Sequence, residues 1–349
     1  MLAIMTWGAG ACGSSPVASK DESDSSANHP WTGLTGQARE DALLEAAKKE
    51  DELMVYSAFN DEQAMADAFM KEYGLEVAVY NGNSESVLQR VVQETSGNKL
   101  NNDVIVLPAP DLESLNDSGI LTPYESEYRD AVSVRGKGED WTGIRRLAFV
   151  AGWNTKKVSE DEVPTDYADL TDPIWKDRMS MELGDYDWYA TLADHYRDKG
   201  MSEAEVDDLF EGLVANSEVT KGHTAQGEFL IAGKFDIALS LYSQTVDRAK
   251  EDGAPISYGD ATPRIGPVVV RYDAGALMKG AENPASATLY LDFQLNEAGF
   301  EVDRELGSLP PVPSADDPIA GADILEQDVA ELVEHREELA DKYDSLVNH

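Results

Sequence analysis

Short apolar runs alternate with segments of helical periodicity along most of this 349-residue chain. Each run is followed by a polar or glycine-containing loop, and the next segment carries apolar residues at helical spacing. This strand–loop–helix order predicts an α/β fold with a mostly parallel sheet and helices on both faces, and the length is enough for two domains. The predicted strands are residues 53–57, 75–80 and 104–107 in a first set and 179–183, 218–221 and 235–241 in a second.

One strand end combines carboxylates with aromatic rings. Residues 179–183 are predicted as a strand, a glycine ends it, and residues 188–197 are predicted as a helix. Open α/β sheets bind ligands where the carboxyl end of a strand meets a helix N-terminus, so this turn is predicted to face a binding cleft. The side chains at the turn are Asp185, Tyr186, Asp187, Trp188 and Tyr189.

The side chains at this turn have two interpretations each. Asp185 and Asp187 either ligate a cation or an amine, or cap the following helix, which is a common role of Asp at such a position. Tyr186, Trp188 and Tyr189 either line the ligand, where an aromatic wall would suit an ammonium group, or belong to the core. The sequence leaves these choices open.

Other strand ends supply further candidates for the cleft. Lys221, His223 and Thr224 lie at a strand-to-helix turn, where backbone N–H groups favour an anion. His223 is either a metal ligand or a solvated loop residue, and Tyr242 ends a strand at the expected cleft edge. The matching loops of the first set contain Ser57, Phe59 and Asn60, and then Asn83 and Ser84.

Acidic residues dominate the composition. Asp and Glu number 67 against 28 Lys and Arg, which gives a formal net charge of −39. This charge excludes nucleic acid as a natural partner and disfavours anionic membrane surfaces. Because the acids are spread along the whole chain, they indicate a solvated surface suited to high salt and do not identify the ligand as a cation.

The N-terminal segment predicts export. Cys12 is the single cysteine, and residues 9–12 (Ala-Gly-Ala-Cys) resemble a bacterial lipobox, in which the cysteine carries lipid. The alternative is a cleaved secretory signal with an incidental cysteine. Residues 14–36 are rich in Ser, Asp, Gly and Pro and are predicted as a tether. We therefore expect a lipid-anchored protein at the extracellular face of the membrane, or a periplasmic one.

Several stretches taken together resemble a known family. They are residues 44–49 with 55–57, residues 167–178, and residues 279–284 with 291–293. In this order, across about 250 residues, they are similar to the extracellular solute-binding proteins (family 1) of ABC importers. Within that family the resemblance is to the branch related to ferric-iron-binding proteins.

The resemblance implies the two-lobed periplasmic-binding-protein fold of type II, with mixed sheets and flanking helices. Two crossover segments, placed at residues 144–153 and 264–270, would join the lobes. The lobes would close on a solute held between the turns described above. The implied division is residues 1–36 for signal and tether, 37–146 plus 268–349 for lobe one, and 147–267 for lobe two.

The ligand remains open at this point. Iron-binding members of the family carry adjacent tyrosines after the strand that corresponds to residues 235–241, whereas this chain has Tyr242-Ser243-Gln244 with a single phenol. Two phenolates suit Fe(III), so this is a departure from the family pattern. Asp185, His223 and Tyr242 could still hold iron, another metal or a metal chelate. The same turns could instead hold a small organic amine or phosphonate.

Three classes of function compete. The first is a monomeric binding lipoprotein that delivers its solute to an ABC permease. The second is a binding protein that serves a sensor. The third is a metal-dependent hydrolytic enzyme, but the sequence has no His-Glu-x-x-His, nucleophile elbow or phosphate loop. Its five histidines are scattered along the chain. We predict a non-enzymatic solute-binding protein with no cofactor apart from its ligand.

Overall fold

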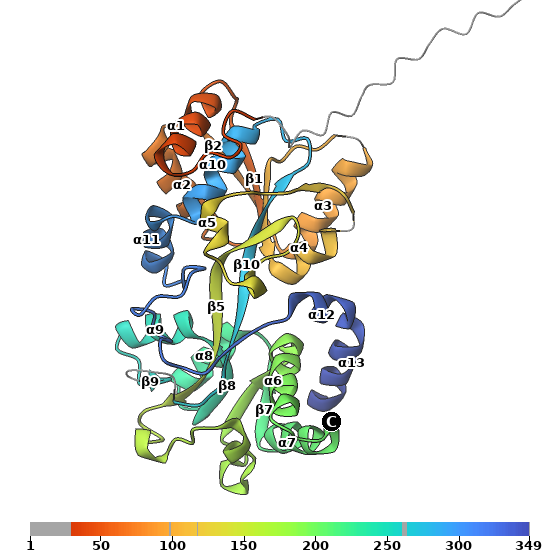
Figure 1. Ribbon diagram of the computed structural model, residues 1–349. Coiled ribbons are helices and arrows are strands. Elements are labelled where there is room, and N and C mark those ends of the chain that lie inside the picture. Colours follow the sequence, from red (N-terminus) through yellow and green to blue (C-terminus); the bar gives the residue numbers. More distant parts are fainter. Residues whose placement is uncertain (1–28, 98, 117, 260–263, 349) are drawn as a thin grey trace, which may run out of the picture.

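The structure is a computed structural model that describes residues 29–97, 99–116, 118–259 and 264–348. Two long antiparallel strands, β5 (Trp141–Asn154) and β10 (Val268–Met278), run from one lobe into the other (Figure 1). Within the described residues a mixed sheet of 11 strands passes through both lobes, with the main order β2-β1-β3-β10-β5-β8-β6-β7. The predicted α/β class, with a mixed sheet, flanking helices and two crossover strands, is confirmed.

Lobe one forms because aliphatic strands alternate with amphipathic helices. Strand β1 pairs in parallel with β2 and β3, and Val55, Phe69 and Ile105 are fully buried between sheet and helices. The strands of this lobe are β1 (Leu53–Ser57), β2 (Val77–Asn81), β3 (Val104–Pro108) and β4 (Leu121–Thr122). Its helices are α1 (Gly36–Ala47), α2 (Glu62–Tyr73), α3 (Ser84–Ser96), α4 (Ala109–Asn116), α5 (Glu127–Asp130), α10 (Pro284–Gln294) and α11 (Glu297–Glu305).

Lobe two repeats this arrangement with its own core. Trp188 and Phe210 pack edge to face in that core, and Leu192 is fully buried there. Its strands are β6 (Met179–Glu182), β7 (Ser217–Thr220), β8 (Ile237–Tyr242) and β9 (Ile256–Ser257). Its helices are α6 (Tyr186–Asp198), α7 (Glu203–Ala215), α8 (His223–Ile231) and α9 (Ser243–Glu251). Short 3-10 turns also occur along the described part of the chain: η1 (Val134–Gly136), η2 (Glu160–Glu162), η3 (Tyr167–Thr171) and η4 (Pro173–Trp175).

The C-terminal segment connects the lobes once more. The sequence predicts a helical segment over residues 323–347, but it begins with strand β11 (Ile324–Glu326), which pairs with β10. Helix α12 (Val329–Glu334) then contacts α4 of lobe one, and α13 (Arg336–Val347) packs on α6 and α7 of lobe two. Because Tyr343 and Val347 belong to the core of lobe two, this last helix departs from the predicted assignment of residues 268–349 to lobe one.

The two faces of the β5–β10 pair carry different charged groups. Neighbouring side chains of a strand point to opposite faces, so Arg145 and Arg146 lie on opposite sides of the sheet. Arg145 is paired in register with Asp273 and also contacts Asp61 and Glu62, at 3.0 and 3.1 Å. Arg146 contacts Asp317 on the other face.

The cluster around Arg145 is buried and rich in carboxyl groups. Burial raises the pKa of Glu62 and of Asp273 above the usual range, although the Arg145 guanidinium opposes both shifts. Burial also raises the pKa of Asp303 well above its usual range, and neither carboxyl oxygen of Asp303 has a hydrogen-bond partner among the described residues. Arg145, together with Arg271 next to Asp273, therefore compensates several buried acids at the joint between the lobes.

None of the helices in the described part of the chain is both long and apolar enough to traverse a bilayer.

Candidate functional site

A small cavity of about 230 Å³ lies where the carboxyl ends of strands from both lobes meet. Lobe one contributes the end of β3 and the start of α4, and lobe two contributes the turns after β6, β7 and β8. Strand β10 and the start of α13 complete its wall. The lining residues are Pro108, Pro110, Asp111, Glu182, Gly184, Asp185, Tyr186, Asp187, His223, Tyr242, Arg271 and Arg336.

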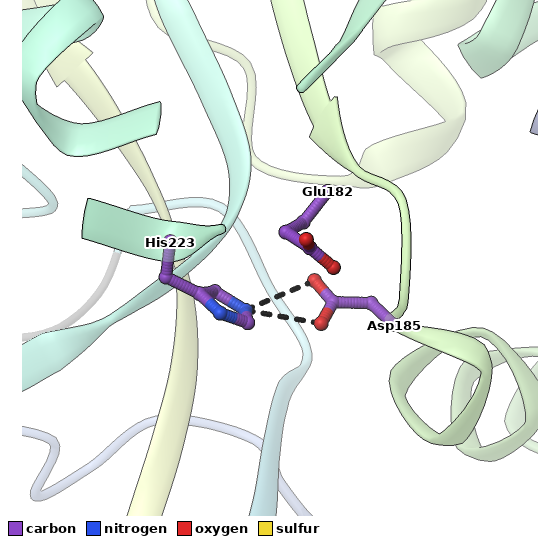
Figure 2. A group of neighbouring side chains, drawn as sticks. All are labelled: Glu182, Asp185 and His223. Atoms are coloured by element: carbon purple, nitrogen blue, oxygen red, sulfur yellow. Dashed lines mark hydrogen bonds and ion pairs between the residues drawn. The ribbon is translucent and has the colours of Figure 1, made fainter. Parts of the chain in front are cut away.

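Three metal-ligating side chains converge at this cavity (Figure 2). Glu182 ends β6, Asp185 precedes α6, and His223 begins α8. The Nε2 atom of His223 lies 3.0 and 3.3 Å from the two carboxylate oxygens of Asp185. One ligand atom from each of the three residues lies within 4.8 Å of the others. Two consecutive strand–helix turns therefore bring these three groups to one point.

Backbone N–H groups orient Glu182. Its Oε1 accepts a hydrogen bond of 2.7 Å from the backbone N–H of Gly222, and its Oε2 accepts one from the N–H of Gly184. A carboxylate accepts up to about four hydrogen bonds, so both oxygens keep lone pairs for a further partner. The two backbone N–H groups thus orient the Glu182 carboxylate and leave part of its acceptor capacity free.

Asp185 occupies the N-cap position of α6 without acting as a cap. Its side chain makes no capping hydrogen bond, and only 3% of the residue is exposed. The carboxylate turns to His223 instead. The capping interpretation of Asp185 therefore does not hold, and the residue stays a candidate ligand.

The carboxylate of Asp187 accepts hydrogen bonds from other groups of the protein. Its Oδ1 accepts the backbone N–H of Trp188, and its Oδ2 accepts a hydrogen bond of 3.0 Å from Nε2 of Gln327. The Arg271 guanidinium lies 3.9 Å from the same Oδ2. Asp187 lines the cavity but holds Arg271 and the C-terminal segment in position.

Tyr242 stacks on the imidazole of His223. Their ring centroids are 4.0 Å apart at an interplanar angle of 20°, and Arg271 lies 5.5 Å from the centroid of the Tyr242 ring. Burial raises the pKa of Tyr242 to about 12, against the opposing effect of the Arg271 guanidinium. The phenol is therefore protonated at neutral pH unless a cation replaces its proton.

The cavity brings together Asp185, Tyr186, Asp187, His223 and Tyr242, all candidates from the sequence. Four further lining residues were not predicted from the sequence: Glu182, Arg271, Asp111 and Arg336. Glu182 is the last residue of a strand already predicted to end at the cleft, so its position was available as a signal. The other three come from segments for which the sequence gives no cleft signal.

Three candidates from lobe two do not line this cavity. Trp188 is fully buried among the rings of Tyr167 and Phe210 and belongs to the core. Lys221 and Thr224 are exposed and do not line the cavity. The helical periodicity of α6 explains the first result, because position 188 faces the core of lobe two while position 185 precedes the helix.

The candidates from lobe one also do not line this cavity. Ser57 is buried, and its Oγ accepts the backbone N–H of Phe59. Asn83 caps α3 by accepting the N–H of Ser86, which leaves it a structural role. Phe59 lies under the Arg145 guanidinium, and Asn60 is exposed. Ser84 begins α3. Lobe one reaches the cavity through Pro108, Pro110 and Asp111 instead.

Cys12 and the predicted lipobox lie outside the described residues.

The chain is similar to proteins of known name. It is 26% identical over 217 residues to Iron uptake protein A1 of Synechocystis sp., an alignment that covers 59% of this chain and 58% of that protein. It is 26% identical over 216 residues to the Fe(3+)-binding periplasmic protein of Serratia marcescens, covering 59% of this chain and 62% of that one. The match thus spans about three fifths of these relatives.

Solved structures show the same fold. Iron-bound HitA from Pseudomonas aeruginosa superposes with a TM-score of 0.68 at 23% identity, covering 84% of this chain and 99% of the other. A sequence model described as bacterial extracellular solute-binding protein matches residues 64–330. These findings confirm the predicted type II fold and the predicted class of function, which is solute binding rather than enzymatic turnover. The chain therefore belongs to the family of bacterial extracellular solute-binding proteins.

Proposed function

We propose that this protein captures a metal ion, free or as a small chelate, in the cavity between its lobes and delivers it to the permease of an ABC importer. The observation that carries this proposal is the convergence of Glu182, Asp185 and His223 within 4.8 Å. Metal–ligand bonds of roughly 2.0–2.2 Å place the ligand atoms of one ion at most about 4 Å apart. Small side-chain adjustments would therefore be enough to enclose an ion.

Iron is the metal we propose first. Two carboxylates and the phenol of Tyr242 are hard oxygen donors, and such donors favour hard cations. Iron is also the metal in the names of the relatives from Synechocystis sp. and Serratia marcescens. This chain would bind it with a single tyrosine, Tyr242, and with Glu182, Asp185 and His223.

The size of the cavity supports an ion over a larger organic solute. Pockets for drug-sized organic ligands have volumes of roughly 300–1,000 Å³, and this cavity has about 230 Å³. An ion with one small anion fits that volume.

A small organic amine or phosphonate is the second candidate. Arg271 and Arg336 line the cavity together with Asp111 and Asp187, so groups of both signs face the same space. A zwitterion could pair its anionic end with an arginine and its ammonium group with a carboxylate. This ligand would need no metal.

Metal analysis of protein purified without chelators or affinity metals distinguishes the two candidates. We expect close to one equivalent of bound iron, and after its removal we expect ferric citrate to raise the melting temperature while 2-aminoethylphosphonate does not. A protein that contains no metal, ignores ferric citrate and Zn²⁺, and is stabilised by the phosphonate would overturn the metal proposal in favour of the second candidate.

Tyr242 is expected to release a proton when the metal binds. Its pKa of about 12 means that the phenol is protonated in the free protein, and a metal-bound phenolate must lose that proton. Affinity should then fall about tenfold for each pH unit between pH 8 and 7, because one proton is released. Calorimetry in buffers of different ionisation enthalpy counts this proton, and Tyr242→Phe should abolish its release.

Tyr258→Phe serves as the matched control, because Tyr258 is a buried tyrosine that donates to Asp247 at 2.9 Å, away from the cavity. Equal proton release by the parent and by Tyr242→Phe would remove Tyr242 from the set of ligands.

For location, family membership indicates an extracellular protein, and we propose lipid anchoring through Cys12. Incorporation of labelled fatty acid that persists in Cys12→Ala would disprove the anchor.

Delivery to a permease, rather than to a sensor, is tested by growth on limiting iron after deletion of the protein.

A further inference from the structure

A second cavity lies away from the candidate metal site. It has a volume of about 1,030 Å³, which is at the upper end of the range for small-molecule sites. Arg146 lines it, while Arg145 faces the other side of the β5–β10 pair. This cavity, which we call the rear cavity, therefore opens on the opposite face of the sheet.

The walls of the rear cavity come from both sides of the joint between the lobes. Arg135 lies next to lobe one, and Thr191 and His195 come from α6 of lobe two. The irregular segment 313–321, strand β11 and helices α12 and α13 close the remaining sides. In Figure 1 the chain that leads from α11 to α12 crosses between the lobes in this region.

The arginines of the rear cavity are already neutralised. Each of them forms an ion pair with a neighbouring aspartate that also lines the cavity: Arg135 with Asp328, Arg146 with Asp317, and Arg197 with Asp194. An anionic ligand would have to compete with these pairs. The positive groups therefore give the cavity little affinity for an anion.

Four carboxylates of the lining remain outside those pairs: Asp198, Glu326, Glu331 and Glu338. Among the described residues, Asp198 and Glu331 make no side-chain hydrogen bond or ion pair, and Glu338 lies 3.8 Å from the His335 ring. Glu326 accepts hydrogen bonds from the hydroxyls of Ser133 and Tyr272. Burial lowers the pKa of His195, so that ring does not offset their charge at neutral pH.

Aliphatic side chains lie beside these carboxylates. Leu332 and Leu339 follow Glu331 and Glu338 directly in the sequence, and Ile319 and Leu325 also line the cavity. A ligand that suits this surface needs cationic groups for the carboxylates and a hydrocarbon body for the aliphatic floor.

We propose that the rear cavity is a second ligand site, which binds an organic di- or polyamine. The ammonium groups pair with Glu331 and Glu338, and the methylene chain lies on Leu332 and Leu339. Because the walls span both lobes, the bound amine bridges them on the side opposite the metal site. This second site does not depend on which solute the candidate metal site binds.

Calorimetric titration with 1,5-diaminopentane tests the proposal. At 0.15 M salt, where the Debye length is about 8 Å, diffuse attraction to an acidic protein is largely screened. We expect saturable binding of one diamine and none of glutarate, which has a similar length but the opposite charge. Charge reversal by Glu331→Lys with Glu338→Lys should weaken diamine binding by at least about tenfold, or 1.4 kcal/mol.

The same helices offer a matched control. Glu334 and Glu337 are exposed on α12 and α13 but do not line the cavity, so Glu334→Lys with Glu337→Lys changes net charge equally and should leave diamine affinity within about twofold. Asp185→Asn should also leave it unchanged, which separates this site from the metal site. Absence of saturable binding, equal losses in the two double variants, or binding of glutarate instead would each overturn the proposal.

Discussion

Arg145→Met is expected to destabilise the folded protein by about 3–5 kcal/mol, the usual cost of removing one partner from a buried ion pair. Arg145 is almost completely buried and lies within 3.1 Å of both Asp61 and Glu62. Methionine fills a similar volume but leaves the carboxyl group of Glu62 without its positive neighbour and Asp273 with Arg271 alone. Urea denaturation of both proteins at pH 7 measures the difference.

The loss in Arg145→Met should depend on pH in a defined direction. Without the guanidinium, the pKa values of Glu62 and Asp273, which burial already raises, rise further in the folded state. The folded variant then binds more protons than the unfolded chain, so its stability falls as pH rises above the unfolded carboxyl pKa of about 4. The destabilisation should therefore be larger at pH 8 than at pH 5.

An exposed arginine provides the comparison for this experiment. Arg304 pairs with Glu297 at 2.8 Å, but both side chains are solvent-accessible, so Arg304→Met should cost less than about 1 kcal/mol. A cost for Arg145→Met as small as that for Arg304→Met, or a cost that grows on acidification, would contradict the role assigned to the buried cluster.

Asp185→Asn is expected to weaken metal binding by more than about 100-fold. Loss of a partner outside the metal's own ligands typically costs about 10–100-fold, and we assign Asp185 to the ligands themselves. Asparagine keeps the shape of the side chain and its contact with His223, but it removes the negative charge. Competition titrations with a coloured iron chelator measure the affinity.

The same variant should fold normally. Asp185 makes no capping hydrogen bond to α6, so the amide does not remove a helix cap. Asp208→Asn, at an exposed position of α7, controls for the loss of one negative charge and should bind iron as the parent does. An affinity for iron that changes less than threefold in Asp185→Asn would place the metal elsewhere.

The sequence predicted the elements of each lobe because strand and helix periodicities are local properties. Residues 53–57 and 188–197, for example, form β1 and most of α6. The turn at Asp185 was predicted to face a cleft for the same reason, since a strand end followed by a helix start is visible in the chain. Its partner His223 was found at the next such turn.

The missed contributions depend on contacts between distant segments. Arg271 and Asp111 reach the cavity because β10 and β3 are neighbours in the sheet, and no local pattern in the sequence encodes that pairing. Ser57 and Asn83 were placed at the cleft by analogy with lobe two. Their side chains instead bond the backbone of their own loops, a common local alternative for Ser and Asn.

The return of the C-terminal segment to lobe two has a consequence for proteolysis. The hydroxyl of Tyr343 donates a hydrogen bond to the backbone carbonyl of Glu182 at 2.5 Å. A protease that clipped the chain near residue 328 would spare every strand, yet it would detach the support beneath one of the proposed metal ligands. Shortened forms of this protein that look intact by their size and circular dichroism should therefore be poor carriers of their cargo.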